Sequence, residues 1–98
     1  MKATKLVHRR DEIAPGAVVE LVLWRVPSPV PGSLHPYKYR LAYVVDGVCV
    51  VRFDNERGKG DHWHYGKKEQ AFTFTGVEAL LEDFQKMIAR WNHENGRD

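Results

Sequence analysis

An Asp-Gly pair at Asp46 and Gly47 separates two runs rich in β-branched and aromatic residues, and it constrains the fold more than any other feature. The two runs are residues 37–45 and 48–55. A two-residue type I′ turn needs positive φ at both central positions, which favours Asp-Gly. The segment is therefore predicted to form an antiparallel hairpin with Val45 opposite Val48.

The register of that hairpin determines which side chains share a face. Continued away from the turn without interruption, it predicts the cross-strand pairs Tyr43–Val50, Leu41–Arg52 and Tyr39–Asp54. One face then mixes aromatic and charged side chains, while the other is more apolar near the turn. Asp54 is expected to anchor the polar loop that follows to Tyr39.

Further strands are predicted on both sides of the hairpin. Residues 3–10 form a short strand and Pro15-Gly16 a turn. The nearly continuous apolar run 17–26 is typical of a central strand. Residues 27–36 contain four of the five prolines, which predicts a loop of fixed shape. Residues 69–74 are expected to add another short strand.

One C-terminal helix is predicted from apolar residues spaced by three and four: Val77, Leu80, Leu81, Phe84, Ile88 and Trp91. Thr75 and Glu78 match a capping box at its start, and the helix is expected to run to about Asn92. The elements together predict an α+β fold, an antiparallel sheet of four to five strands with one helix packed across it.

Length and composition exclude several classes of protein. A chain of 98 residues has room for one modest core, so residues 1–98 are predicted to be a single domain. The net charge of +2 permits nucleic-acid binding without requiring it. Residues 1–12 lack the apolar segment of a signal peptide, and no stretch approaches the ~20 apolar residues of a membrane span. We therefore expect a cytoplasmic protein, with its single Cys49 buried and inert.

Titratable side chains are densest in residues 54–65, which hold three acids, two bases and two histidines. Such a loop between rigid elements is a common place for a functional site. In an extended backbone His62 and His64 lie on one face, since side chains alternate. The neighbouring Asp61 is expected to orient one of the two imidazoles.

These residues match the needs of a metal-independent endoribonuclease. Histidine can take a proton from the ribose 2′-hydroxyl and give one to the departing 5′-oxygen, because both of its forms are populated near neutral pH. Arg57 and Lys59 supply positive charge for the phosphate. The predicted catalytic residues are His62, His64, Asp61, Arg57 and Lys59, with no cofactor. Side chains expected to bind the RNA, partly by stacking on its bases, are Arg40, Tyr39, Trp63 and Tyr65.

Two alternatives remain open. Asp61, His62 and His64, with Asp54 or Glu56, have the residue types of a metal site in a metal-dependent nuclease. The neighbouring cations disfavour that interpretation. A non-catalytic module that binds RNA or a protein partner would also use a loop of this composition.

The sequence resembles the TumE-type toxins of bacterial toxin–antitoxin modules in three stretches. They read LWRVP at residues 23–27, YKYRLAY at 37–43 and DNERGKGDH at 54–62, followed by HY at 64–65. Trp63 departs from the arginine that is commoner there. The resemblance implies a type II toxin that inhibits growth and is silenced by a helix-turn-helix antitoxin. Endoribonuclease activity is inferred from the loop chemistry and from analogy with other small β-rich toxins.

Overall fold

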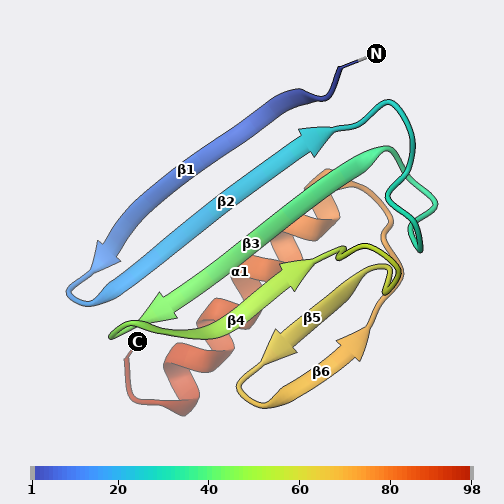
Figure 1. The fold of residues 1–98 in the computed structure, drawn as a ribbon. Coiled ribbons are helices and arrows are strands. Elements are labelled where there is room, and N and C mark those ends of the chain that lie inside the picture. Colours follow the sequence, from blue (N-terminus) through green and yellow to red (C-terminus); the bar gives the residue numbers. More distant parts are fainter. Residues whose placement is uncertain (1, 98) are drawn as a thin grey trace.

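A computed structural model of the chain describes residues 2–97 and shows one sheet and one helix (Figure 1). The predicted domain 1–98 therefore includes two residues, Met1 and Asp98, outside the described part. The elements are β1 (Thr4–Ala14), β2 (Ala17–Arg25), β3 (Tyr37–Val45), β4 (Val48–Asp54), β5 (His62–Tyr65), β6 (Lys68–Ala71) and α1 (Val77–Glu94).

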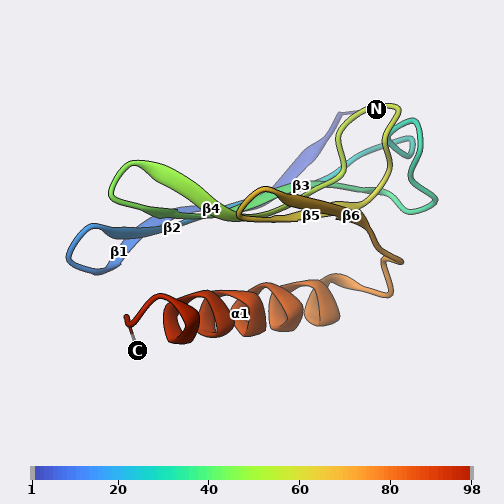
Figure 2. The same cartoon turned by 90° about the horizontal axis from the view of Figure 1, so that it is seen from below.

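The six strands follow one another across the sheet in chain order, and every neighbouring pair is antiparallel. Helix α1 lies along one face of the sheet, and within residues 2–97 no helix or strand covers the opposite face (Figure 2). The predicted α+β fold is confirmed. The sheet exceeds the expected four to five strands because His62–Tyr65 forms a strand of its own. Within residues 2–97 no helix has the length and apolarity needed to cross a membrane.

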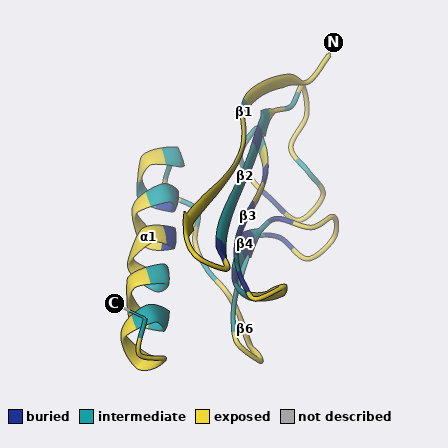
Figure 3. Cartoon of the chain, turned by 90° about the vertical axis from the view of Figure 1, so that its left-hand side faces the viewer, coloured by how far each residue is buried: buried dark blue, intermediate teal, exposed yellow. Residues whose placement is uncertain are grey.

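The helix begins at Val77 and ends at Glu94, slightly beyond the predicted end. Its N-cap is Gly76, with φ 141°, and no side chain caps the first turn. The predicted capping box at Thr75 is therefore wrong. The buried side of α1 faces the sheet (Figure 3), and it contributes Leu80 and Phe84 to the core.

A β-bulge near the turn changes the hairpin register. Val45 pairs with Val48 as predicted, but the register shifts between Tyr43 and Val44. The pairs beyond it are Tyr43–Val51, Leu41–Phe53 and Arg40–Asp54, so the predicted pairs are wrong by one residue on β4. The extra residue reverses which β4 side chains face the helix.

The shifted register gives the sheet two chemically different faces. Val51 and Phe53 now join the β3 side chains beneath α1, and the core consists of Ala17, Leu23, Tyr39, Leu41, Tyr43, Val45, Val51, Phe53, Leu80 and Phe84. Cys49 is exposed, which corrects the expected buried thiol. The surface away from α1, hereafter the open face, carries Lys5, His8, Arg10, Glu12, Val18, Glu20, Val22, Trp24, Lys38, Arg40, Ala42, Val44, Arg52, Asp54, His62, His64, Glu69 and Ala71.

Candidate active site on the open face

Two rows of paired residues cross the whole sheet and place both candidate histidines on the open face. Directly paired residues of antiparallel strands project to the same side. One row is His8, Val22, Arg40, Asp54, His62 and Ala71. The next row is Arg10, Glu20, Ala42, Arg52, His64 and Glu69. The histidines therefore lie beside Asp54 and Arg52, respectively.

His64 is held by two charged neighbours. Nη2 of Arg52 lies 2.9 Å from Nε2 of His64. A guanidinium can only donate, so Nε2 accepts this hydrogen bond and the ring hydrogen is on Nδ1. A carboxylate oxygen of Glu69 is 3.8 Å from the same Nε2. The neutral form of His64 therefore accepts a hydrogen bond from Arg52, and its protonated form would face the negative charge of Glu69.

His62 has the same Nδ1–H tautomer as His64, but a different contact fixes it. Its Nδ1 donates to the carbonyl oxygen of Gly60 at 3.1 Å, since a carbonyl can only accept. In the neutral ring, Nε2 then carries a lone pair. The two imidazoles project from the same strand with Cα atoms about 7 Å apart, as expected for residues two apart in a strand.

Arg52 links His64 to Asp54. Its Nε lies 3.0 Å from Oδ2 of Asp54. That nitrogen is buried and makes no aligned hydrogen bond, so the contact is an ion pair only. The guanidinium therefore has a donor that a phosphate oxygen can use if the side chain turns.

A hollow of about 310 Å³ lies beside Arg52 and Asp54, the cross-strand partners of His64 and His62. Its charged lining consists of three cations, Lys38, Arg40 and Arg52, and two acids, Asp54 and Glu56. Of the two loop cations predicted to be catalytic, Lys59 lies 3.6 Å from Glu69 and 3.7 Å from Glu56. Arg57 is exposed, and no ion pair to it is found within the described chain. The sequence missed Lys38 and Arg52, whose placement depends on the sheet register.

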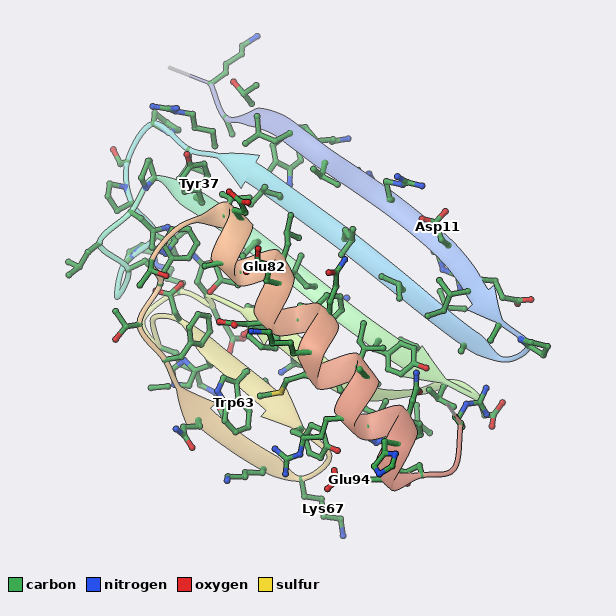
Figure 4. All side chains as sticks on the ribbon, turned by 180° about the vertical axis from the view of Figure 1, so that it is seen from behind. Asp11, Tyr37, Trp63, Lys67, Glu82 and Glu94 are labelled. Atoms are coloured by element: carbon green, nitrogen blue, oxygen red, sulfur yellow. The ribbon has the colours of Figure 1, made fainter. Side chains whose placement is uncertain are left out.

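Three aromatic residues expected to bind RNA lie on the helix face instead. Trp63 pairs with Phe53 and lies near α1 (Figure 4). The Tyr65 hydroxyl donates to Glu94, and the Arg90 guanidinium lies 4.6 Å from the Tyr65 ring centroid. Tyr39 is only 3% exposed. Of the four expected binding residues, Arg40 alone reaches the open face.

Asp61 also points away from His62 and His64, because side chains alternate along the chain entering β5. It accepts hydrogen bonds from the Tyr39 hydroxyl at 2.6 Å and from Nε2 of His35 at 2.8 Å. Burial, followed by the bond to Asp61, raises the pKa of Tyr39 far above its ordinary value. Asp61 does orient an imidazole, but it is His35, to which the sequence assigned no role.

The anchor of the polar loop is Asn55 and not Asp54. Oδ1 of Asn55 accepts from the Tyr39 backbone N–H at 3.0 Å. Its Nδ2 donates to the Tyr37 carbonyl at 2.6 Å and to Ser33 Oγ at 3.3 Å. Asn55 is 2% exposed, which is unusual for an amide and therefore a sign of a fixed structural role.

The alternative metal set is not assembled. Between residues 2 and 97 no group of three or more His, Cys, Asp or Glu side chains is placed to hold a metal ion. Asp61 lies on the opposite side of the backbone from His62 and His64 and is engaged by His35 and Tyr39.

Comparison with known proteins gives one finding. A family model described as "Toxin TumE" matches residues 2–92, nearly the whole chain. No curated protein and no solved structure gives a significant match.

Proposed function

This chain belongs to the TumE toxin family and is the toxin component of a toxin–antitoxin system, and we propose that it acts as a metal-independent endoribonuclease. The active site of this proposal is the part of the open face around His62 and His64. On this proposal the protein acts in the cytoplasm, because that is where its RNA substrate is found. The partner, on the same proposal, is a helix-turn-helix antitoxin of a type II module.

One observation carries the catalytic proposal. Two histidines with defined and different hydrogen-bond partners lie on the open face of the sheet, next to a hollow that three cations and two acids line. General acid–base cleavage of RNA needs a proton acceptor, a proton donor and positive charge at the phosphate. In this proposal His62 is the proton acceptor, His64 is the proton donor, and Arg52 and Arg40 supply the positive charge.

The proposed reaction is an internal transfer that needs no co-reactant. Nε2 of His62 removes the proton from a ribose 2′-hydroxyl, and the 2′-oxygen forms a bond to phosphorus. The bond from phosphorus to the 5′-oxygen breaks, and protonated His64 gives its proton to that oxygen. The products are a 2′,3′-cyclic phosphate and a 5′-hydroxyl end.

Arg52 connects substrate binding with the state of His64. When Nε2 of His64 takes up a proton, it can no longer accept the hydrogen bond from Arg52. Glu69 then faces the imidazolium, since it lies 3.8 Å from Nε2. Arg52 becomes available to donate to the phosphate, where the arginine fork suits two oxygens.

The test is to replace each histidine and to measure growth and RNA cleavage separately. His62→Ala and His64→Ala, expressed without the antitoxin, are expected to lose growth arrest. In purified form each should cleave RNA about 10²–10⁴-fold more slowly than the parent while still binding it. His93→Ala removes an imidazole from the last turn of α1 and serves as the matched control.

Three results would contradict the proposal in different ways. If both single mutants still arrest growth, His62 and His64 are not catalytic. If the parent binds RNA but produces no cyclic phosphate end, the site is a non-catalytic binding surface. If EDTA abolishes cleavage and a divalent ion restores it, the reaction depends on metal.

A further inference from the structure

Trp24 is the one tryptophan of three that lies on the open face. Trp63 shares the helix face with Phe53, and Trp91 packs its edge on Tyr43 with centroids 6.0 Å apart. Trp24, near the end of β2, pairs with Lys5 on one side and Lys38 on the other. Because Lys38 alternates with the buried Tyr39, this row projects away from α1.

The surroundings of Trp24 are cationic or apolar. Nζ of Lys5 lies 5.2 Å from the indole centroid, and Lys38 occupies the opposite cross-strand position. The next open-face residue along β2 is Val22, which pairs with Arg40. None of these four neighbours is acidic. An indole with cations on both sides has the chemistry of a platform for a nucleobase with phosphates beside it.

The position of this platform fits the proposed active site. From Trp24 on β2 to His62 on β5 the sheet spans three strand spacings, or about 14 Å. Lys38, Arg40 and Arg52 line the hollow between them, together with the acids Asp54 and Glu56. A single strand running across the sheet therefore passes three cations, and it meets the indole before it reaches the histidines.

We propose that Trp24 is a base-stacking subsite for unpaired RNA, with Lys38 and Arg40 contacting the phosphates between it and the histidines. This inference rests on the proposed function, because it makes single-stranded RNA the substrate class of the same site. A stacked base must be unpaired, so a duplex is excluded from the subsite. Tyr39, Trp63 and Tyr65, which were predicted from sequence to bind RNA, face the helix and are therefore not part of this subsite.

The experiment measures binding without chemistry. A mixed-sequence single strand of 2′-O-methyl RNA lacks the hydroxyl proton needed for attack, so it binds without being cleaved. Its addition at low salt is expected to quench the fluorescence of Trp24. Trp24→Ala should weaken binding about ten- to one-hundredfold, the loss typical of one stacked base, while Trp24→Phe keeps most of the affinity.

Trp63→Ala is the matched control. Trp63 also has a lysine near its ring, with Nζ of Lys68 5.6 Å from the centroid, but it lies on the other face of the sheet. It should keep the affinity of the parent for the 2′-O-methyl strand. Circular dichroism of each variant verifies that the sheet is intact, and Trp24→Phe provides a conservative replacement if Trp24→Ala does not fold.

The outcomes separate this inference from the catalytic proposal. Loss of affinity in Trp24→Ala, with no cleavage of ordinary RNA by the parent, supports the subsite and contradicts catalysis. Cleavage by the parent, with unchanged affinity in Trp24→Ala, overturns the subsite alone. Equal binding of a 2′-O-methyl duplex, or an equal loss in Trp63→Ala, also overturns it. If only the purified antitoxin quenches Trp24, the surface belongs to the protein partner and the inference is wrong.

Discussion

His35 and Asp61 are 26 residues apart in the sequence, yet Nε2 of His35 donates to Oδ1 of Asp61 at 2.8 Å. His35 Nδ1 accepts from the Tyr37 N–H at 3.2 Å, which fixes the hydrogen on Nε2. The His35 ring also stacks on Phe74 with centroids 3.7 Å apart. The proline-rich loop is thereby joined to the start of β5, the strand that carries both candidate catalytic histidines.

Asp61→Asn tests this connection. The side chain of Asp61 is 10% exposed, and its Oδ1 accepts from both His35 and Tyr39, so an amide keeps the acceptor but removes the negative charge that strengthens both buried bonds. The free energy of unfolding is expected to fall by about 2–4 kcal/mol, measured by urea denaturation. Glu56→Gln, in the same loop but 64% exposed, should change it by less than about 0.5 kcal/mol. Equal effects of the two substitutions would contradict the structural role of Asp61.

Tyr39 makes stability depend on alkaline pH. Its pKa is raised in the folded protein, by burial first and then by the hydrogen bond to Asp61. Above about pH 10 the unfolded chain releases the phenolic proton while the folded protein retains it. The stabilisation that Tyr39 provides through its raised pKa is therefore fully present below pH 10. Above pH 10 the free energy of unfolding should fall by about 1.4 kcal/mol per pH unit for each tyrosine that stays protonated only in the folded protein.

The measurement is urea denaturation of the parent and Tyr39→Phe between pH 8 and pH 11, a range set by the ordinary tyrosine pKa of about 10. Tyr39→Phe should be less stable than the parent at pH 8, and its free energy of unfolding should fall less steeply above pH 10. Tyr65→Phe is the comparison, because burial and the bond to Glu94 also raise the pKa of Tyr65, but nearer the surface. A parent curve that stays flat through pH 11 would rule out this account.

Gly60 and Gly32 hold two loops in close contact. A Cβ added at Gly60, where φ is +75°, would lie 2.7 Å from the Gly32 carbonyl oxygen. Gly58 has a similar φ of +83° but open space around it. Gly58→Ala is therefore expected to cost about 1 kcal/mol from backbone strain, and Gly60→Ala at least about 1 kcal/mol more from the clash. Thermal unfolding of both variants checks the difference, and equal costs would show that the loops separate easily.

Local sequence signals were enough to predict the hairpin turn, the helix and the α+β fold. They did not reveal the bulge between Tyr43 and Val44, because a one-residue insertion leaves the β-rich pattern of residues 48–54 unchanged. Because of that bulge, Arg52 lies on the open face beside His64. The shared face of His62 and His64 could be predicted from the alternation of side chains along a strand. The same alternation places Asp61 on the face opposite to the two histidines.

The contacts of His35 and Asn55 could not be predicted in the same way. Both depend on how the loop of residues 27–36 folds back against residues 55–61, with separations of 22 and 26 residues between bonded side chains. No periodic pattern specifies such a contact. The prolines predicted a stiff loop, and a hydrogen bond from the Val26 N–H to the Pro36 carbonyl closes it. The sequence did not show that this loop packs against residues 55–61.

Arg52→Lys tests whether the guanidinium is needed beside His64. Arg52 contacts His64 at 2.9 Å and Asp54 at 3.0 Å through separate nitrogens, and a lysine ammonium cannot reproduce both contacts with the same geometry. RNA cleavage is expected to fall about 10- to 100-fold, while the free energy of unfolding changes by less than about 1 kcal/mol. Arg10→Lys, in the same row but with its head group 3.7 Å from Glu20 on the edge of the sheet, is the matched control and should retain cleavage. Full activity in Arg52→Lys would mean that a simple positive charge suffices there, and that the paired contacts to His64 and Asp54 have no part in the reaction.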